Sequence, residues 1–382
     1  MIKISAQDKN KQVEIQSTRP LYASQILIGK TPEQALSTLP LLFNICGIAQ
    51  SHAGYLAIEQ KMNRKKDFSQ QTAREMLVLA ENAREYLLRL FLDAPSLFQI
   101  DNSTLELSYL GQMTKAFSSA LFKEGRAFAF DSQLNAELSE VTLLIDKLER
   151  FLIDTQFQMP LNGWANLQND TLQQWAKEYD SLAGKIIKML YDKNWTSQGY
   201  ADFNALPVLD EKELLETFNA SKVTQFIAQP EWQGQCFETS ALSRQFSHPL
   251  VKALHQKYST GLITRWVARL TELASIPDQM RQLHKQIINH DSFIAKENEH
   301  SSLGIAQVEA ARGRLVHQVE IEQGKICQYQ ILAPTEWNFH PQGSLAKSLA
   351  GLKSDNKQEL EQLAHLMINI CDPCVGYRLS VH

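Results

Sequence analysis

The C-terminal end of the chain carries two thiols at a spacing that suits metal binding. Cys371 and Cys374 form a Cys-x-x-Cys pair in a sequence with only five cysteines. Such a pair can be a redox couple, half of a metal site, or two small residues on one helical turn. Cys46, with the flexible Gly47 and then His52 after it, could face the same site. Because thiolate and imidazole both bind transition metals, these residues predict a metal site that joins the two ends of the chain.

The composition is that of an ordinary globular protein. With 382 residues, 44% of them hydrophobic and 21% charged, the chain can form one large domain or two smaller ones. The net charge is −4 and the longest basic run is Arg64–Lys66, so the sequence excludes a nucleic-acid partner. The N-terminus lacks the apolar core of a signal peptide, and no run of about 18 apolar residues occurs. We therefore expect a cytoplasmic protein, no membrane partner and free thiols.

Helices are predicted to position the thiols. Thr31 followed by Pro32 is typical of a helix start, and this helix runs towards Cys46. The segment 69–93 has apolar residues at three- and four-residue spacing, which predicts an amphipathic helix beside the Cys46 segment. Further helices are predicted over 134–154, 170–193, 249–274, 277–299 and 356–370. The charged face of the 69–93 helix is interpreted as solvent-exposed. Alternatively, this face turns inward and brings Glu81 and Arg84 to the site.

Few segments have the pattern of strands. Residues 11–16 alternate like a short strand, and 314–321 with 326–332 around Gly324 predict a hairpin. We expect these strands to form one small sheet. The stretch 199–238 has little periodicity and is predicted to link or cover other elements. The expected fold class is mainly α (α+β), a helical bundle with a small antiparallel sheet.

Several short segments form a recognisable set of motifs. They are Glu309-Ala-Ala-Arg-Gly313 with Leu315 and His317, Gly324-Lys-Ile326, Pro334-Thr-Glu-Trp-Asn338, Glu238-Thr-Ser-Ala-Leu-Ser-Arg244, Asp372-Pro-Cys374 and Ile45-Cys46-Gly47. This set resembles the large subunits of nickel–iron hydrogenases. The resemblance covers residues 19–60, with the N-terminal cysteine motif, and 236–382, and it leaves a helical middle over 69–230. It implies a single large-subunit-like domain over residues 1–382.

The chain departs from that family at the residues that hold the metals. The resemblance implies a Cys-x-x-Cys pair at each end, but Ala49 and Tyr377 stand at the second cysteine positions. Alanine offers no donor, and a phenol is a poor replacement for thiolate towards nickel. The family's early Arg-Gly-x-Glu carboxylate is also missing from its counterpart, residues 19–22, and no tail follows His382. The sequence thus resembles degenerate relatives of the large subunit, the hydrogenase maturation proteins of the HupK/HoxV type, and no enzymatic activity is expected.

This resemblance implies a scaffold or chaperone that assembles an Fe(CN)2CO unit or transfers it to the hydrogenase large subunit. Cys46 and Cys374 are the expected iron ligands, with Cys371 as a third candidate, and nickel is not expected. Arg312 would donate hydrogen bonds to a cyanide ligand, and Glu309 would orient or neutralise it. The remaining candidates around the metal are His52 and Asp372. The implied partners are maturation complex proteins of the HypC/HypD type and the precursor of the hydrogenase large subunit.

Alternatives remain open for both ligands and function. In a strict motif alignment Cys46 and Cys374 match terminal nickel positions, but His52 follows Cys46 one residue early, and this shift could move Cys46 to the iron side. Alternatively, Cys371 joins Cys374 on one metal. Cys236 and Cys327 are interpreted as structural. The rival functions are a metal-free chaperone that binds the hydrogenase precursor and a catalytic large subunit.

Overall fold

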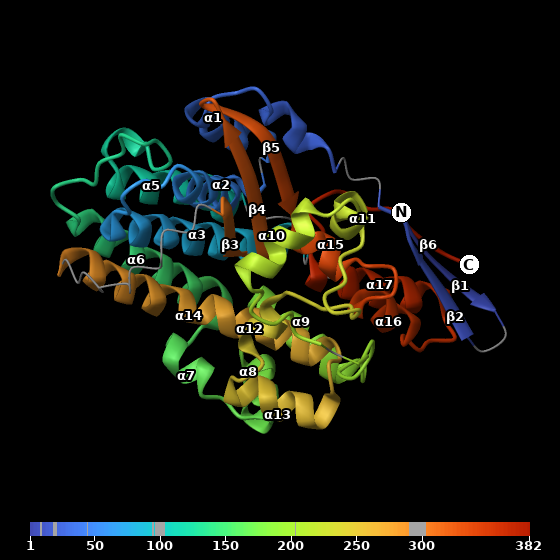
Figure 1. Cartoon of the computed structure of the whole chain (residues 1–382). Coiled ribbons are helices and arrows are strands. Elements are labelled where there is room, and N and C mark those ends of the chain that lie inside the picture. Colours follow the sequence, from blue (N-terminus) through green and yellow to red (C-terminus); the bar gives the residue numbers. More distant parts are fainter. Residues whose placement is uncertain are drawn as a thin grey trace.

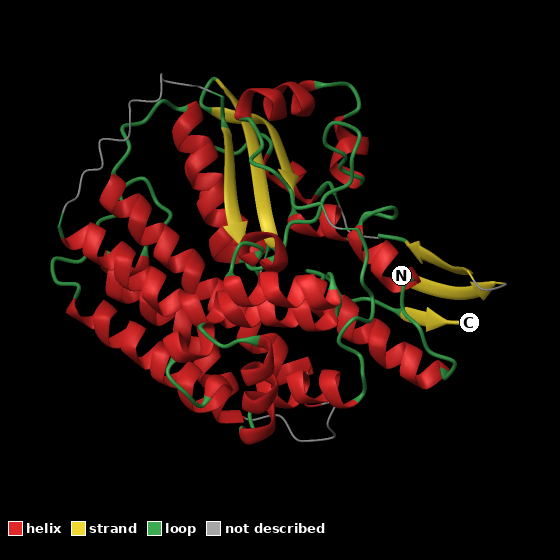
Figure 2. Cartoon of the chain, turned by 90° about the horizontal axis from the view of Figure 1, so that it is seen from below, coloured by secondary structure: helices red, strands yellow, loops and turns green. Residues whose placement is uncertain are grey.

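The computed structural model describes the chain except for residues 8–9, 18–20, 44, 94, 96–103, 203 and 290–302. Three predicted features lie partly outside the described residues: the 19–22 segment, the N-terminal cysteine motif within 19–60, and the end of the 277–299 helix. A helical body carries two small sheets at its periphery (Figures 1 and 2). The predicted mainly α class is confirmed.

Three helices near the N-terminus set the position of Cys46. They are α1 (Pro32–Leu42), α2 (Gly47–Lys61) and α3 (Phe68–Leu88), and α3 continues as a π-helical turn over Arg89–Asp93. The Thr31 hydroxyl accepts the Gln34 N–H, while the Gln34 side chain accepts the Thr31 N–H, a reciprocal cap that fixes the start of α1. α2 packs against both α1 and α3. The prediction that α3 lies beside the Cys46 segment is confirmed.

The remaining helices are α5 (Thr104–Leu121), α6 (Ser139–Leu152), α7 (Leu161–Ala165), α8 (Asn169–Glu178), α9 (Leu182–Asp192), α10 (Glu211–Asn219), α11 (Val223–Ala228), α12 (Ala241–Gln245), α13 (Pro249–Tyr258), α14 (Leu262–Ile288), α15 (Pro334–Asn338), α16 (Ser344–Ala350) and α17 (Lys357–Cys371). Short 3-10 or π turns occur over Ala23–Leu27, Lys123–Gly125 and Ile153–Phe157. Among the described residues, no helix combines the length and apolar character needed to cross a membrane.

Three predictions of helix limits are wrong. The 249–274 helix is two helices, because α13 ends at Tyr258, Ser259 has a φ of 52° and α14 begins at Leu262. The 170–193 helix is two helices, because the Ser181 hydroxyl accepts the Gly184 N–H and starts α9 anew. The boundary expected before Pro277 is absent, and α14 passes through this proline. α14 packs against α3, α6, α12 and α13, so its buried surface offsets the one backbone hydrogen bond that proline removes. The first half of α14 is almost wholly buried and is the central element of the largest core cluster.

Two sheets form where one was expected. The predicted hairpin is β4 (Gly313–Glu322) with β5 (Lys325–Leu332), and β3 (Ile305–Ala310) extends it into an antiparallel sheet in the order β3-β4-β5. The predicted N-terminal strand, β2 (Asn10–Ile15), belongs instead to a second sheet in the order β2-β1-β6, with β1 (Ile2–Gln7) and β6 (Leu379–Val381). β1 pairs with β6 in parallel, so the two termini lie side by side (Figure 1).

Helices cover both faces of the β3-β4-β5 sheet. On one face Tyr55 and Ile58 of α2 join a core cluster with Val319 of β4. On the other face α10 and α11 join a cluster that includes Val316 of β4. The stretch 199–238 therefore covers the sheet, as predicted, through two short helices that the sequence pattern did not reveal. The sheet is thereby fixed against α2, the helix that begins at Cys46.

Candidate metal centre

Cys46 lies at the N-terminal cap of α2, where backbone N–H groups lack helical partners. Its own side chain caps none of them. The carboxylate of Glu81, from α3, accepts the N–H groups of Ile48 and Ala49, both at 2.9 Å. The Cys46 sulfur instead receives a weak hydrogen bond from Gln50 Nε2 at 3.8 Å. The thiol is thus held at a helix start whose backbone donors are already satisfied.

Cys374 lies in the loop that follows α17. The Thr335 hydroxyl of α15 donates to its sulfur at 3.2 Å. The Cys46 pKa is raised to about 12, first by burial and then by the negative charge of Glu81; the charge of ionised Cys374 raises it further, whereas that of Arg312 lowers it. These electrostatic effects require proximity, so the structure brings Cys46, Cys374 and Arg312 into one neighbourhood.

Arg312 is the centre of a buried ionic network between α3 and the C-terminal motif. Its Nη2 lies 3.0 Å from Glu85 Oε2 and 3.2 Å from Asp372 Oδ2, and its Nε donates to the Asp372 carbonyl at 3.1 Å. Arg84 pairs with Glu85 at 2.7 Å, and Arg89 pairs with Asp372 at 2.7 Å. The guanidinium therefore ties the Asp-Pro-Cys segment to α3 and fixes the loop that carries Cys374.

A tight turn presents Arg312. Gly313 follows it with a φ of 126°, a conformation open to glycine, and a β-carbon there would come within 2.2 Å of the Thr239 carbonyl oxygen. The Asn338 amide donates to the carbonyls of Arg312 and Thr239, at 3.0 and 2.7 Å. The backbone of this turn is therefore locked onto α15, the helix that also contacts Cys374.

The expected role of Glu309 towards Arg312 is wrong. In the β3–β4 ladder Glu309 stands directly opposite Arg314, and its carboxylate accepts Arg314 Nε at 2.7 Å. Its other oxygen pairs with Arg244 Nη1 at 3.2 Å. Directly opposed residues project to the same face of a sheet, so Glu309 is committed to these two arginines while Glu85 and Asp372 neutralise Arg312.

His52 contacts groups other than the two thiols. Its ring is buried near Phe128 and lines a cavity between α2, α3, α14 and β3 that Glu309 also lines. Burial and the positive charge of Arg74 lower its pKa to about 3, so the ring is neutral. No hydrogen bond to its Nδ1 occurs within the described part of the chain. The contacts of His52 and Glu309 described above involve neither thiol, and a role for His52 beside a metal stays a prediction.

Cys371 lies in the core. It is 6% exposed at the end of α17 and belongs to the main core cluster. Burial raises its pKa to about 12; the charged groups that influence it are Arg265 and Glu238, a buried ion pair, and then Arg269 and Asp372, of which Asp372 also pairs with Arg312. The alternative in which Cys371 joins Cys374 on one metal stays a prediction.

A four-thiolate nickel–iron centre does not fit the residues present. Ala49 is fully buried in the first turn of α2 and has no donor atom. The Tyr377 hydroxyl lies 2.7 Å from His365 Nδ1 and donates to Asn369 Oδ1 at 3.2 Å, both on α17. Burial raises the pKa of Tyr377 to about 12, which disfavours a phenolate ligand. Two thiols thus remain as protein donors in this neighbourhood.

Sequence reasoning missed most of the groups that support the thiols. Glu85 and Thr335 were not singled out. Glu81 was expected at the site only if the charged face of α3 turned inward. That face does turn inward, and burial raises the pKa of Glu81 to about 7. A signal was present, because the charges of the 69–93 segment lie among its apolar residues instead of on a separate face.

Comparison with known proteins identifies relatives along the whole chain. Residues 190–382 match the family described as nickel-dependent hydrogenase. The chain is 28% identical to the hydrogenase expression/formation protein HoxV of Cupriavidus necator, across 96% of this chain and 92% of that protein. It is 26% identical to the hydrogenase expression/formation protein HupK of Rhizobium leguminosarum, across 97% and 92%. The resemblance to this type of protein is confirmed.

Solved structures establish the fold. The reduced Ni-Fe-Se hydrogenase from Desulfomicrobium baculatum aligns with a TM-score of 0.65 at 14% identity, covering 97% of this chain and 95% of that one. An NAD+-reducing [NiFe]-hydrogenase aligns with a TM-score of 0.58 at 12% identity, covering 96% and 93%. The expected large-subunit-like fold is confirmed.

Proposed function

Because this chain belongs to the nickel-dependent hydrogenase family, we propose that it is a hydrogenase maturation protein that holds an Fe(CN)2CO unit as cargo between Cys46 and Cys374. The names of its relatives, hydrogenase expression/formation proteins, support the maturation role. The cargo site is supported by a chain of contacts: Glu81 binds the start of α2 just after Cys46, Glu85 one turn further along α3 pairs with Arg312, and Arg312 pairs with Asp372, two residues before Cys374. Further parts of the proposal are a cytoplasmic location and the absence of catalytic turnover.

Two protein thiolates suit an iron unit that brings its own diatomic ligands. Cyanide and carbon monoxide occupy most of the iron coordination sphere, so few protein donors are needed. The Cys46 thiol, with its pKa near 12, is protonated in the metal-free protein, and binding the iron displaces the proton. On transfer, the two iron–sulfur bonds break, the thiolates regain protons and the large subunit supplies new thiolates, with no change of oxidation state.

Arg312 supplies the hydrogen bonds that this cargo requires. Its Nε and Nη2 are used by Asp372 and Glu85, whereas Nη1 takes part in none of the hydrogen bonds found within the described ranges. A guanidinium fixed on one edge can donate from its other edge to a cyanide nitrogen. The network around Arg312 therefore positions a cation beside the thiols before cargo arrives.

The proposed partners follow from loading and release. The unit is loaded by maturation proteins of the HypC/HypD type and released to the precursor of the hydrogenase large subunit. This chain shares the fold of hydrogenases but lacks two of the four thiolates that the family resemblance implies, because Ala49 and Tyr377 stand at their positions. It would thus release the iron to a precursor whose further thiolates can also bind nickel, because soft thiolates suit both metals and the completed two-metal centre retains the iron.

Infrared spectroscopy of the anaerobically purified protein tests this function. When the protein is isolated from cells with active hydrogenase maturation, we expect cyanide and carbonyl bands together with iron and without nickel. Cys46→Ala and Cys374→Ala should each abolish the bands, whereas Cys327→Ala, at an exposed cysteine, should retain them. Absence of bands and iron in the wild type, with hydrogenase assembly intact in both variants, would instead support the metal-free chaperone.

A further inference from the structure

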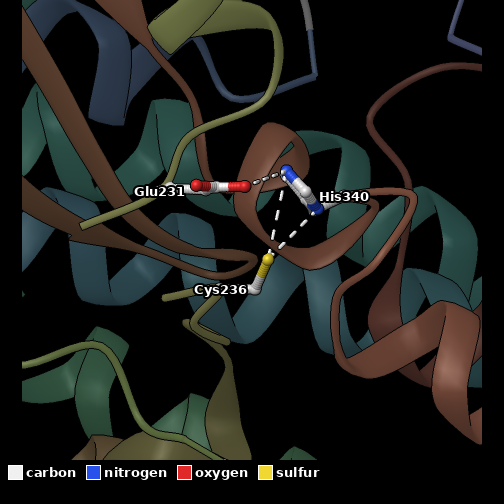
Figure 3. A group of neighbouring side chains, drawn as sticks. All are labelled: Glu231, Cys236 and His340. Carbon is white, nitrogen blue, oxygen red and sulfur yellow. Dashed lines mark hydrogen bonds and ion pairs between the residues drawn. The ribbon is translucent and has the colours of Figure 1, made fainter. Parts of the chain in front are cut away.

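A second group of metal-binding side chains lies outside the Cys46 neighbourhood. Glu231, Cys236 and His340 each place one donor atom within 4.8 Å of the others (Figure 3). The Cys236 sulfur is 3.3 Å from His340 Nδ1 and 4.0 Å from Nε2, and Glu231 Oε1 is 4.0 Å from Nε2. The sequence analysis interpreted Cys236 as structural and did not single out the other two residues.

A tight turn brings two of these donors together. Trp232 and Gln235 exchange two backbone hydrogen bonds of 3.0 Å, and the two residues between them both have positive φ. This two-residue turn places Glu231 and Cys236 beside one another. Trp232 is buried in the core cluster that covers the β3-β4-β5 sheet, so the turn has a fixed base.

The third donor comes from the opposite side. His340 follows α15 and is 3% exposed, and its ring faces Glu231 and Cys236 (Figure 3). The buried ring is a fixed ligand, whereas the Glu231 side chain is 49% exposed and can move.

We propose that Glu231, Cys236 and His340 form a reversible binding site for a divalent first-row transition metal ion such as Zn2+. Thiolate, imidazole and carboxylate are the donors that Zn2+ takes in proteins, and three of them leave a fourth position for water. Metal–ligand bonds of about 2.0–2.3 Å require tetrahedral donors to lie about 3.3–3.8 Å apart. The two 4.0 Å separations, from His340 Nε2 to Cys236 Sγ and to Glu231 Oε1, exceed this range by a few tenths of an ångström. A small rotation of the Cys236 side chain would close the first, and a rotation of the half-exposed Glu231 side chain would close the second.

The position of the proton on the neutral His340 ring opposes metal binding and so favours release of the ion. The Gln342 N–H donates to Nδ1 at 3.1 Å, which places the proton of the neutral ring on Nε2. When a metal binds Nε2, the ring proton moves to Nδ1, the Gln342 hydrogen bond is lost and the Cys236 thiol releases its proton. The lost hydrogen bond opposes binding, so the ion can leave when a competing ligand is present.

The proposed ion would fasten the 231–236 turn to the end of α15. The same helix contacts Cys374 through Thr335 and the Arg312 turn through Asn338. The ion would therefore brace the helix on which the Cys46 neighbourhood rests, without contributing a ligand to it. This second site does not depend on the proposed function.

Co2+ binding to the full-length protein tests the second site. The measurement uses the double variant Cys46→Ala/Cys374→Ala, so that the two thiols of the Cys46 neighbourhood cannot contribute. We expect one Co2+ per chain with a thiolate-to-cobalt charge-transfer absorption that excess Zn2+ removes and excess Mg2+ does not. Cys236→Ser should abolish the absorption, and Cys327→Ser, the matched control, should leave it unchanged.

Two further variants complete the test. Glu231→Gln, at a half-exposed position, should weaken Co2+ binding by at least the roughly 10–100-fold that loss of an outer-shell partner costs. His340→Gln should abolish binding, and circular dichroism checks that this buried substitution leaves the protein folded. Absence of the absorption in the parent protein, or its persistence in Cys236→Ser, would overturn the proposal.

Discussion

The two thiol-containing regions of this molecule differ in how many donors they offer and in what surrounds them. The Cys46 neighbourhood has two thiols from distant parts of the chain, backed by a buried network of arginines and carboxylates. The Cys236 cluster has three different donors, one of them half-exposed, and within the described part of the chain its carboxylate pairs with no arginine. A preassembled metal unit needs few protein ligands but many positioned hydrogen-bond donors. A bare ion needs more ligands and an open path to water.

The largest expected change in stability comes from removing Arg312, the central cation of the Cys46 neighbourhood. Arg312→Met should destabilise the protein by about 3 kcal/mol, the lower end for a broken buried pair, because Glu85 and Asp372 lose this partner but keep Arg84 and Arg89. Chemical denaturation monitored by circular dichroism measures the change. Arg126→Met, which breaks an exposed pair with Asp131, is the matched control and should cost about 1 kcal/mol or less.

The same variant separates the two regions. Under conditions where Arg312→Met remains folded, Co2+ binding at the Cys236 cluster should be unchanged, because Asn338 contacts the Arg312 carbonyl and not its side chain. If Arg312→Met weakened Co2+ binding at the Cys236 cluster as much as iron binding at Cys46 and Cys374, the two regions would not be independent.

A smaller effect should appear in the pH dependence of stability. Burial raises the Glu81 pKa from its ordinary value of 4.5 to about 7. Between these values the unfolded carboxyl ionises while the folded one stays protonated, so wild-type stability falls as pH rises through this range. The metal-free Glu81→Gln variant lacks this loss, and its stability relative to wild type should increase by up to about 3 kcal/mol between pH 4.5 and 7.

Denaturant titrations at several pH values measure that difference. Glu33→Gln, an exposed carboxyl in the first turn of α1, is the control and should show no comparable trend. A constant difference between Glu81→Gln and wild type across this range would contradict a raised Glu81 pKa.

The cysteine motifs predicted the meeting of the chain ends, but not the groups that hold them. Cys46 and Cys374 stand in motifs recognisable from the sequence, and the parallel pairing of β1 with β6 is consistent with their meeting. The motif Glu309-Ala-Ala-Arg-Gly313 led to the prediction that Glu309 orients or neutralises Arg312. Strand register decided otherwise, because the residue opposite Glu309 is Arg314.

Other features depend on contacts between distant segments. Glu85 reaches Arg312 across 227 positions, and Cys236 reaches His340 across 104. Neither pair has a local pattern that could reveal it. The continuation of α14 through Pro277 also depends on tertiary packing, which overrides the local preference of proline for a helix boundary.

X-ray absorption at the iron edge tests most directly whether Cys46 and Cys374 hold the iron together. The account predicts two sulfur scatterers per iron in the loaded wild-type protein and in Cys371→Ala, whose sulfur lies in the core. Cys46→Ala and Cys374→Ala should contain no stoichiometric iron. Iron bound in wild type without sulfur scatterers, or with a sulfur lost in Cys371→Ala, would contradict the account.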